Sequence, residues 1–200
     1  MLLPALNKAR EKARNSSCTS NLKGLTSAAI MYSDEYNGEL PLYYDNVNPW
    51  LYHIVDGNLN HALMKAAFCP SGEPVTAGNE FYMVYGIHFG HDGNAMKFST
   101  MAPREPSRSA VTAVNSRFLN RSPSQMPLFG DSRKVGSKVQ WHTMLALNMA
   151  TNEGLVTVRH SMRANLAFFD GHVSNFDRPG LYGIGYRYIV DHTDTAISIW

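Results

Sequence analysis

Apolar residues recur at helical spacing over the first 36 residues of the chain. The stripe is formed by Leu2, Leu6, Ala9 and Ala13 and, after a slip of about one residue, by Cys18, Leu22, Leu25, Ala29 and Tyr32. Steps of three and four residues place such side chains on one face of a helix. The opposite face carries Lys8, Arg10, Glu11, Lys12, Arg14 and Lys23. At roughly 1.5 Å per residue the pattern predicts one helix of about 50 Å, far longer than an average helix.

The predicted helix ends at Asn37-Gly38, because these residues readily adopt the left-handed conformation that follows a helix. Pro41 comes next and cannot continue a helix. We therefore divide the chain into an N-terminal helix, residues 1–36, and a globular head, residues 37–200.

Strand patterns dominate the second half of the head. Residues 165–169 and 172–176 are β-prone runs around Asp170-Gly171, which predicts a hairpin with a two-residue turn. Further strands are expected at residues 81–87, 126–130, 155–160, 186–190 and 196–200, and short helices near Trp50 and at residues 59–68. A long helix followed by a largely antiparallel sheet indicates the α+β class.

Composition and charge narrow the function classes. Apolar residues make up 44% and charged residues 17% of the chain, which is typical of a globular protein. The net charge of +2 is too small to indicate a nucleic-acid partner. No run of apolar residues is long enough for a transmembrane helix, and the basic residues follow the first apolar run, unlike those of a signal peptide. The basic cluster from Lys8 to Lys23 is either a solvated helix face or the boundary of a membrane segment.

Candidate metal ligands gather around the predicted hairpin. His160, Asp170 and His172 offer two imidazoles and a carboxylate, which is a reasonable metal-binding set. In the alternative interpretation Asp170 serves the turn and both histidines are ordinary strand residues. Asp191 and Asp194 allow calcium in principle, but they lack EF-hand spacing. We therefore expect no cofactor and keep calcium or another metal only as an alternative.

A catalytic triad can be written as Ser132, His160 and either Asp131 or Asp170. The chain lacks the G-x-S-x-G nucleophile turn, and any chain of this size offers such a set. We therefore expect a protein that is not an enzyme. Asp131 is more simply explained as a structural partner of Arg159 or His160, because a buried strand-end carboxylate needs a partner.

Aromatic side chains suggest a possible ligand surface. They are Tyr43, Tyr44, Trp50, Tyr52 and a second group of Tyr182, Tyr186 and Tyr188. Such rings either line a carbohydrate-binding surface or belong to the core.

The two cysteines also allow two interpretations. Cys18 lies on the apolar face of the predicted helix, and Cys69 lies in the loop sequence Phe68-Cys69-Pro70-Ser71-Gly72. They are either buried thiols of a cytosolic protein or a disulfide in an oxidising compartment.

Two distant stretches resemble one bacterial family. Residues 1–14 together with Cys18, Asn21-Leu22-Lys23 and residues 32–38 resemble the region just after the membrane segment of prepilin-like proteins. His160, nine further residues and then Asp170-Gly171 are similar to the processing-associated motif of a large pseudopilin-like family. Residues 127–132 and the loop around Cys69 resemble a strand and a loop of the same family.

The resemblance implies a pilin-like fold and a pseudopilin-like structural subunit of a type II secretion or type IV pilus-like assembly. The implied partners are other pilin-like subunits and the secretion or pilus machinery. Family members begin with a leader, a prepilin peptidase site and an apolar helix, and on this resemblance the chain starts near the end of that helix. The full-length protein would be anchored in the inner membrane, with its head in the periplasm or at the cell surface. A surface-displayed module that binds carbohydrate or another ligand is the alternative.

The resemblance adds two expectations for the structure. An extracytoplasmic compartment favours a disulfide between Cys18 and Cys69, which would close a loop of about fifty residues and contribute roughly 4 kcal/mol. The helix stripe from Cys18 to Tyr32 should be buried against the sheet. The stretch from Leu2 to Ala13 should project or be less well covered, because its neighbours would be lipid or other subunits.

Overall fold

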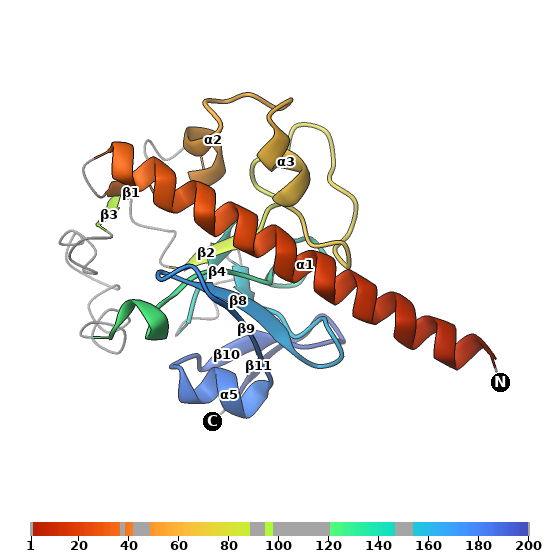
Figure 1. Cartoon of the computed structure of the whole chain (residues 1–200). Coiled ribbons are helices and arrows are strands. Elements are labelled where there is room, and N and C mark those ends of the chain that lie inside the picture. Colours follow the sequence, from red (N-terminus) through yellow and green to blue (C-terminus); the bar gives the residue numbers. More distant parts are fainter. Residues whose placement is uncertain are drawn as a thin grey trace.

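The computed structural model describes residues 2–36, 39–41, 49–88, 95–97, 121–146 and 154–199. Helix α1, Leu2–Glu35, crosses the head and extends past it at the N-terminal end (Figure 1). The predicted long helix is therefore confirmed, while its predicted stop at Asn37-Gly38 lies outside the described residues. Among the described residues, no helix combines the length and the apolar character that crossing a membrane requires.

The main sheet has five strands in the order β6-β2-β4-β8-β9. They are β2, Gly86–His88; β4, Pro127–Gly130; β6, Thr143–Met144; β8, Ala164–Phe168; and β9, Val173–Phe176. All neighbours are antiparallel except β2 and β6, which are parallel. The sheet also takes strands from the middle of the chain, so it is mixed and not confined to the C-terminal part. The α+β, pilin-like class is confirmed, with a long helix on a mostly antiparallel sheet.

Smaller elements surround this sheet. Three two-stranded pairs join β1, Glu39–Pro41, to β3, Ala95–Lys97; β5, Ser132–Lys134, to β7, Gly154–Val156; and β10, Tyr188–Val190, to β11, Ala196–Ser198. Short helices are α2, Trp50–Ile54; α3, Ala62–Ala66; α5, Arg178–Gly183; and the 3-10 turn η1, Pro123–Gln125. The strands predicted near residues 126–130, 186–190 and 196–200 are therefore present, each shorter than expected.

The strand predicted at residues 81–87 is mostly wrong. The amides of Tyr82 and Met83 donate to the carbonyl of Asn79, which folds this stretch into turns, and β2 starts only at Gly86. The apolar pattern here marks burial in a turn, because Met83 and Val84 are covered without pairing as a strand.

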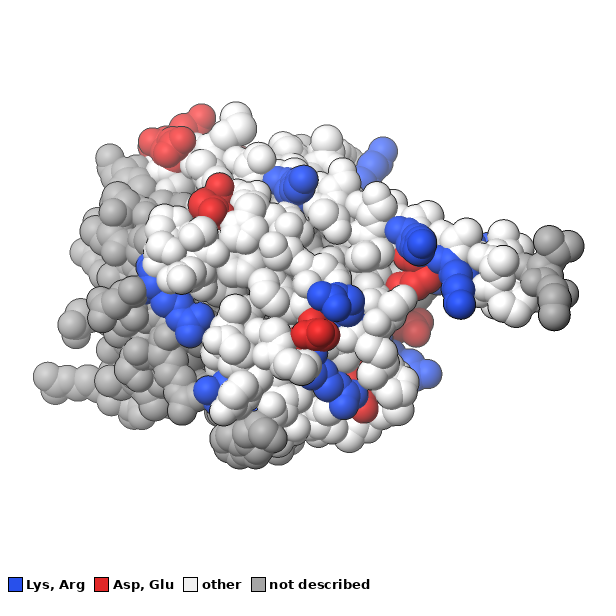
Figure 2. Space-filling view, turned by 60° about the horizontal axis from the view of Figure 1, so that its bottom comes forward, with Lys and Arg blue, Asp and Glu red and all other residues white. Residues whose placement is uncertain are grey.

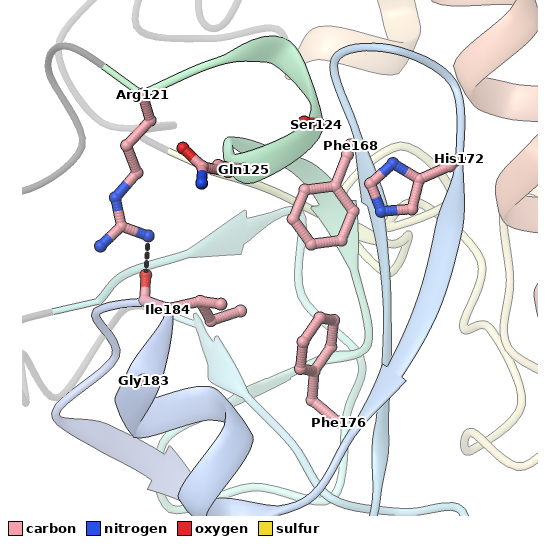
Figure 3. Close-up of a pocket in the computed structure, with 8 residues that line it drawn as sticks. All are labelled: Arg121, Ser124, Gln125, Phe168, His172, Phe176, Gly183 and Ile184. Atoms are coloured by element: carbon pink, nitrogen blue, oxygen red, sulfur yellow. Dashed lines mark hydrogen bonds between the residues drawn. The ribbon is translucent and has the colours of Figure 1, made fainter.

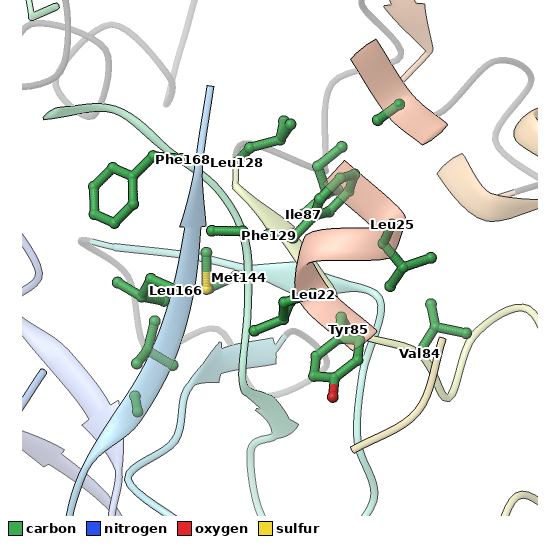
Figure 4. Close-up of a cluster of buried hydrophobic side chains, with 14 of the residues drawn as sticks. Leu22, Leu25, Val84, Tyr85, Ile87, Leu128, Phe129, Met144, Leu166 and Phe168 are labelled. Carbon is green, nitrogen blue, oxygen red and sulfur yellow. The ribbon is translucent and has the colours of Figure 1, made fainter. Parts of the chain in front are cut away.

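The core lies between α1 and the sheet. Cys18, Leu22, Leu25 and Ala29 are at most 1% exposed. In Figure 4, Leu22 and Leu25 project from the helix into the cluster that includes Phe129 of β4. The second half of the predicted stripe is therefore the buried face of α1.

The first turns of α1 have a different environment. Leu3 is 73% exposed and Leu6 is 47% exposed, and Ala9 and Ala13 are exposed as well. Cys18 is the first buried position along the described helix. The predicted split in burial is confirmed.

The hairpin between β8 and β9 has a longer loop than predicted. The amide of Phe168 donates to the carbonyl of His172 at 2.9 Å, so three residues separate the paired positions. The amide of Phe169 donates to Met126 outside the hairpin, at 3.1 Å, which keeps Phe169 out of the β8–β9 ladder. Of the three loop residues only Gly171 has a positive φ, +89°. This agrees with a three-residue loop whose glycine takes the left-handed position.

A buried cluster of cysteine, histidine and aspartate

Four chemically reactive side chains meet beneath α1. They are Cys18 on α1, Cys69 in the loop after α3, Asp131 between β4 and β5, and His160 shortly before β8. Their sulfur, nitrogen and oxygen atoms all lie within 4.8 Å of one another. Each side chain is buried, with Cys69 the most exposed at 4%. The cluster therefore joins the long helix to three separate parts of the head.

The backbone holds His160 in a tight turn. His160 and Arg163 exchange backbone hydrogen bonds of 3.0 and 3.1 Å across Ser161 and Met162. Both central residues have positive φ, 51° and 65°, as in a type I′ turn, although neither is glycine, asparagine or aspartate. This is a strained conformation for such side chains, and strain of this kind concentrates at functional positions.

The shortest contacts link the four residues in pairs. The Cys18 Sγ donates to Asp131 Oδ1 at 3.4 Å, and Cys69 Sγ lies 3.2 Å from His160 Nε2. His160 Nε2 is also 3.6 Å from Asp131 Oδ2. The predicted pairing of Asp131 with His160 is confirmed.

Further contacts hold three members of the cluster in place. His160 Nδ1 lies 3.0 Å from Glu11 Oε1 on α1. The backbone amide of Asn165 donates to Asp131 Oδ2 at 2.8 Å, and the amide of Cys69 donates to Gln140 Oε1 at 3.0 Å. The side chains of His160 and Asp131 and the backbone of Cys69 are therefore held by residues outside the cluster.

Burial and mutual charge shift the protonation states of the cluster. The hydrogen bond with Cys18 lowers the pKa of Cys69 to about 3, aided by His160 and the charge of Arg159 and opposed by burial. Burial lowers the pKa of His160, but its contacts with Cys69 and Asp131 outweigh this and raise the pKa to about 9. Burial raises the pKa of Asp131 to about 7, and the neighbouring thiolate adds to that rise. Burial also raises the pKa of Cys18. Near neutral pH the cluster therefore holds a thiolate beside an imidazolium.

A thiolate next to an imidazolium is the arrangement of a cysteine nucleophile. Such a nucleophile needs an opening for its substrate. One surface cleft is lined by residues that include Leu59 and Glu80, and another lies beside Phe168. Neither of these two clefts has a member of the cluster in its wall. Two sulfurs, an imidazole and a carboxylate are also a donor set that binds transition metals.

The metal set predicted from the sequence, His160, Asp170 and His172, is wrong. Asp170 and His172 pair with each other at the tip of the hairpin, and the His172 ring stacks on Phe168 at 4.2 Å. His160 lies at the other end of β8, whose five residues span roughly 16 Å at the usual rise per strand residue. Among the described residues, Cys18, Cys69, Asp131 and His160 are the one group of three or more Cys, His, Asp or Glu side chains whose ligand atoms lie close enough to share a metal ion.

The cleft beside the hairpin has a volume of about 380 Å³ (Figure 3). Phe168, Phe176 and His172 form one side, and Arg121 with Gln125 forms another. The Arg121 guanidinium donates to the carbonyl of Ile184 at 2.8 Å, so it braces the wall of the cleft.

The aromatic ligand surface predicted from the sequence is not assembled in the described residues. Trp50 and Tyr186 are fully buried, because both rings belong to the core. Tyr52 packs edge-on against Phe81, and Tyr182 is 42% exposed on α5, in a different part of the head. Tyr43 and Tyr44 lie outside the described residues.

The disulfide predicted between Cys18 and Cys69 is not formed in this structure, which contains both residues as free, buried thiols. The fold does bring them together from the helix and the loop, as that prediction required. The covalent bond stays a prediction.

A second buried imidazole gives a prediction about acid stability. His88 in β2 is fully buried, and its Nδ1 lies 3.0 Å from the Tyr186 hydroxyl. Burial lowers the pKa of His88 to about 3, and the charge of Arg121 adds to this. The unfolded chain, with a histidine pKa near 6.5, binds this proton more readily. The free energy of unfolding should therefore fall as the pH drops from about 6.5 towards 3.

The change His88→Gln should remove this contribution while retaining a polar group beside Tyr186. Between pH 7 and pH 4.5 the variant should lose about 2 kcal/mol less stability than the parent protein, as measured by urea unfolding. The change His192→Gln, at an exposed position, should leave the loss of stability between pH 7 and pH 4.5 the same as in the parent protein. Equal losses in the parent and in His88→Gln would contradict this assignment.

Comparison with known families gives one partial match. Residues 7–56 match the sequence model of a family described as "Protein of unknown function (DUF1559)", which is associated with pilin-like proteins. The matched segment covers most of α1 and extends into and just past α2. No curated protein and no solved structure matches the chain.

Proposed function

We propose that this protein is a pilin-like structural subunit, a pseudopilin of a type II secretion or type IV pilus-like assembly, which works by assembly and not by catalysis. The change in burial along α1 carries the proposal. From Cys18 to Ala29 the apolar stripe is buried against the head, whereas Leu3 and Leu6 are 73% and 47% exposed on a helix that extends past it (Figure 1).

Exposed leucines on a projecting helix need neighbours outside the head. In water their exposure carries a cost that burial against another apolar surface would remove. In the proposed assembly the helix continues, in the full-length protein, into an apolar segment that lies in the inner membrane and then packs against the same helix of other subunits. Leu3 and Leu6 would be covered by lipid or by those helices.

Charge along the same segment supports this orientation. Lys8, Arg10, Lys12 and Arg14 lie between the exposed leucines and the first buried position, with Glu11 as the acidic residue among them. Figure 2 shows basic side chains gathered where the helix leaves the head. Basic residues are enriched beside membrane segments, where they meet anionic headgroups.

The partial family match adds independent support, because it covers the helix on which the proposal depends. The proposed location is the inner membrane, with the head in the periplasm or at the cell surface. The proposed partners are other pilin-like subunits and their assembly machinery.

The test starts from the full-length gene expressed in bacteria with and without a prepilin peptidase. With the peptidase, the expected product is a shortened protein in the membrane fraction. Without the peptidase, the expected product is the uncut protein. Uncut protein that stays in the cytosol in the presence of the peptidase would overturn the proposal.

A pair of variants separates assembly from folding. Leu3→Asp combined with Leu6→Asp should strongly reduce the amount of subunit recovered in sheared fibres or in cross-linked oligomers. Leu59→Asp introduces a carboxylate at a 48% exposed position on the head and should leave that amount unchanged. Equal recovery for the two variants would show that the exposed leucines of α1 have no part in assembly.

A further inference from the structure

We propose that Cys18, Cys69, Asp131 and His160 form a structural binding site for a soft divalent transition metal, with zinc as the expected ion. The inference concerns how the head is held together. The site requires both cysteines in their reduced form, because a disulfide between them would exclude the metal.

The spacing of the four donors fits a tetrahedral centre. Zinc binds sulfur at about 2.3 Å and nitrogen or oxygen at about 2.0–2.2 Å, so adjacent donors around one ion lie roughly 3.2–3.8 Å apart. The contacts of 3.4 Å between Cys18 and Asp131 and of 3.2 Å between Cys69 and His160 lie in that range. So does the 3.6 Å contact between His160 and Asp131, and all four donors lie within 4.8 Å of one another. A small contraction would therefore complete the coordination.

The chemistry of the donors selects the kind of metal. Thiolate sulfur and imidazole nitrogen favour zinc and related ions, whereas calcium and magnesium prefer oxygen donors. All four positions are supplied by the protein and all four side chains are buried. A closed site of this type stabilises a fold and leaves no position for a substrate.

The surrounding contacts match those that orient metal ligands. The Glu11 carboxylate, 3.0 Å from His160 Nδ1, would hold the proton on that nitrogen and leave Nε2 directed at the cluster. The Asn165 amide fixes the Asp131 carboxylate at 2.8 Å. For the metal to enter, His160 Nε2 and the Cys18 thiol each lose a proton, and Asp131 binds as its carboxylate.

The local charge is compatible with a bound dication. Two thiolates and one carboxylate around a doubly charged ion leave one negative charge. Arg159 is close enough to interact with the charges of Cys69 and Asp131, and it donates to Gln140, the residue that also binds the Cys69 amide. The guanidinium would balance the remaining charge.

The experiment uses the chain purified under reducing conditions, with zinc added and then removed from solution by gel filtration. The expected result is about one zinc ion per chain, a raised melting temperature, and Co²⁺ substitution that gives the absorption of a tetrahedral cobalt–thiolate centre. Cys69→Ser and Cys18→Ser should each abolish these signals.

A second variant tests the site without replacing a cysteine, because a cysteine variant that fails to fold would also lose zinc. Glu11→Gln removes the charge beside His160 from a partly exposed position of α1 and should weaken zinc binding about 10- to 100-fold without unfolding the head. The control Asp170→Asn, in the hairpin loop, should bind zinc as the parent protein does.

Two results would overturn the proposal. One is a reduced, folded chain that retains no zinc. The other combines two observations: Glu11→Gln and the parent protein bind zinc equally, and both cysteines of the zinc-loaded parent still react with a thiol reagent. A disulfide between Cys18 and Cys69 would exclude the metal. A chain that forms this disulfide again after reduction and takes up no zinc therefore also overturns the proposal. Neither result affects the proposed assembly, because no membrane or partner subunit takes part in the measurement.

Discussion

Replacing Leu22 with alanine is expected to lower the free energy of unfolding of the head by about 3 kcal/mol, while the same change at Leu6 alters it by less than about 0.5 kcal/mol. Leu22 is fully buried between α1 and the sheet, so its truncation removes apolar burial and leaves a cavity. Leu6 is 47% exposed and lies before the helix enters the head. Urea unfolding followed by circular dichroism measures both values.

The comparison tests the boundary that the structure places along one continuous helix. Both residues belong to the same sequence stripe, and both changes remove the same atoms. Similar losses at the two positions would mean that the first turns of α1 also pack on the head, which would remove the main support for an assembly surface there.

Replacing Trp50 with alanine is expected to cost about 3–5 kcal/mol, because the largest buried side chain in the core would be lost. The Trp50 ring lies 4.4 Å from that of Phe129, and its Nε1 donates to the carbonyl of Tyr85 at 3.2 Å. Trp50→Phe should cost less, because it retains an aromatic ring and loses the hydrogen bond. Thermal and urea unfolding measure the series.

Tyr182 supplies the matched control for Trp50. The sequence offered both residues as candidate ligand-binding aromatics, yet Tyr182 is 42% exposed, and the Arg187 guanidinium lies over its ring at 4.0 Å from the centroid. Tyr182→Ala should therefore cost no more than about 1 kcal/mol. A Trp50→Ala variant as stable as Tyr182→Ala would contradict the buried position of α2.

The long helix and its buried face could be predicted from the sequence because helical periodicity is a local property. The same holds for β4, a short apolar run beside turn residues. The turn at Asp170-Gly171 was placed correctly in the chain but given the wrong length. The length of the loop depends on the hydrogen bond from the amide of Phe169 to the carbonyl of Met126, a residue of a distant segment. The two-residue turn with positive φ lies instead at Ser161 and Met162, where no residue signals it.

The buried cluster could not be predicted as a unit. Its members are separated by at least 29 residues along the chain, so no short spacing between ligands exists to be recognised. Each residue also had a sufficient local explanation, such as the apolar helix face for Cys18 and the loop for Cys69. Only the pair of Asp131 and His160 followed from the sequence, because a buried carboxylate requires a partner. The set of His160, Asp170 and His172 failed because residues close in sequence are held apart by an extended strand.

The position of the cluster along α1 has a mechanical consequence. Cys18 is the first buried residue of the described helix, and Glu11 and Asn15 just before it already bond to His160 and Asn165 of the head, so the turns before Glu11 are the ones that project. A sideways load on the projecting turns would act first on the polar contacts of Glu11 with His160 and of Asn15 with Asn165. A pull along the helix axis would instead load the contacts from Cys18 to Ala29 together, in shear. The head should therefore resist axial tension far better than bending, which is the direction of load on a subunit held within a fibre.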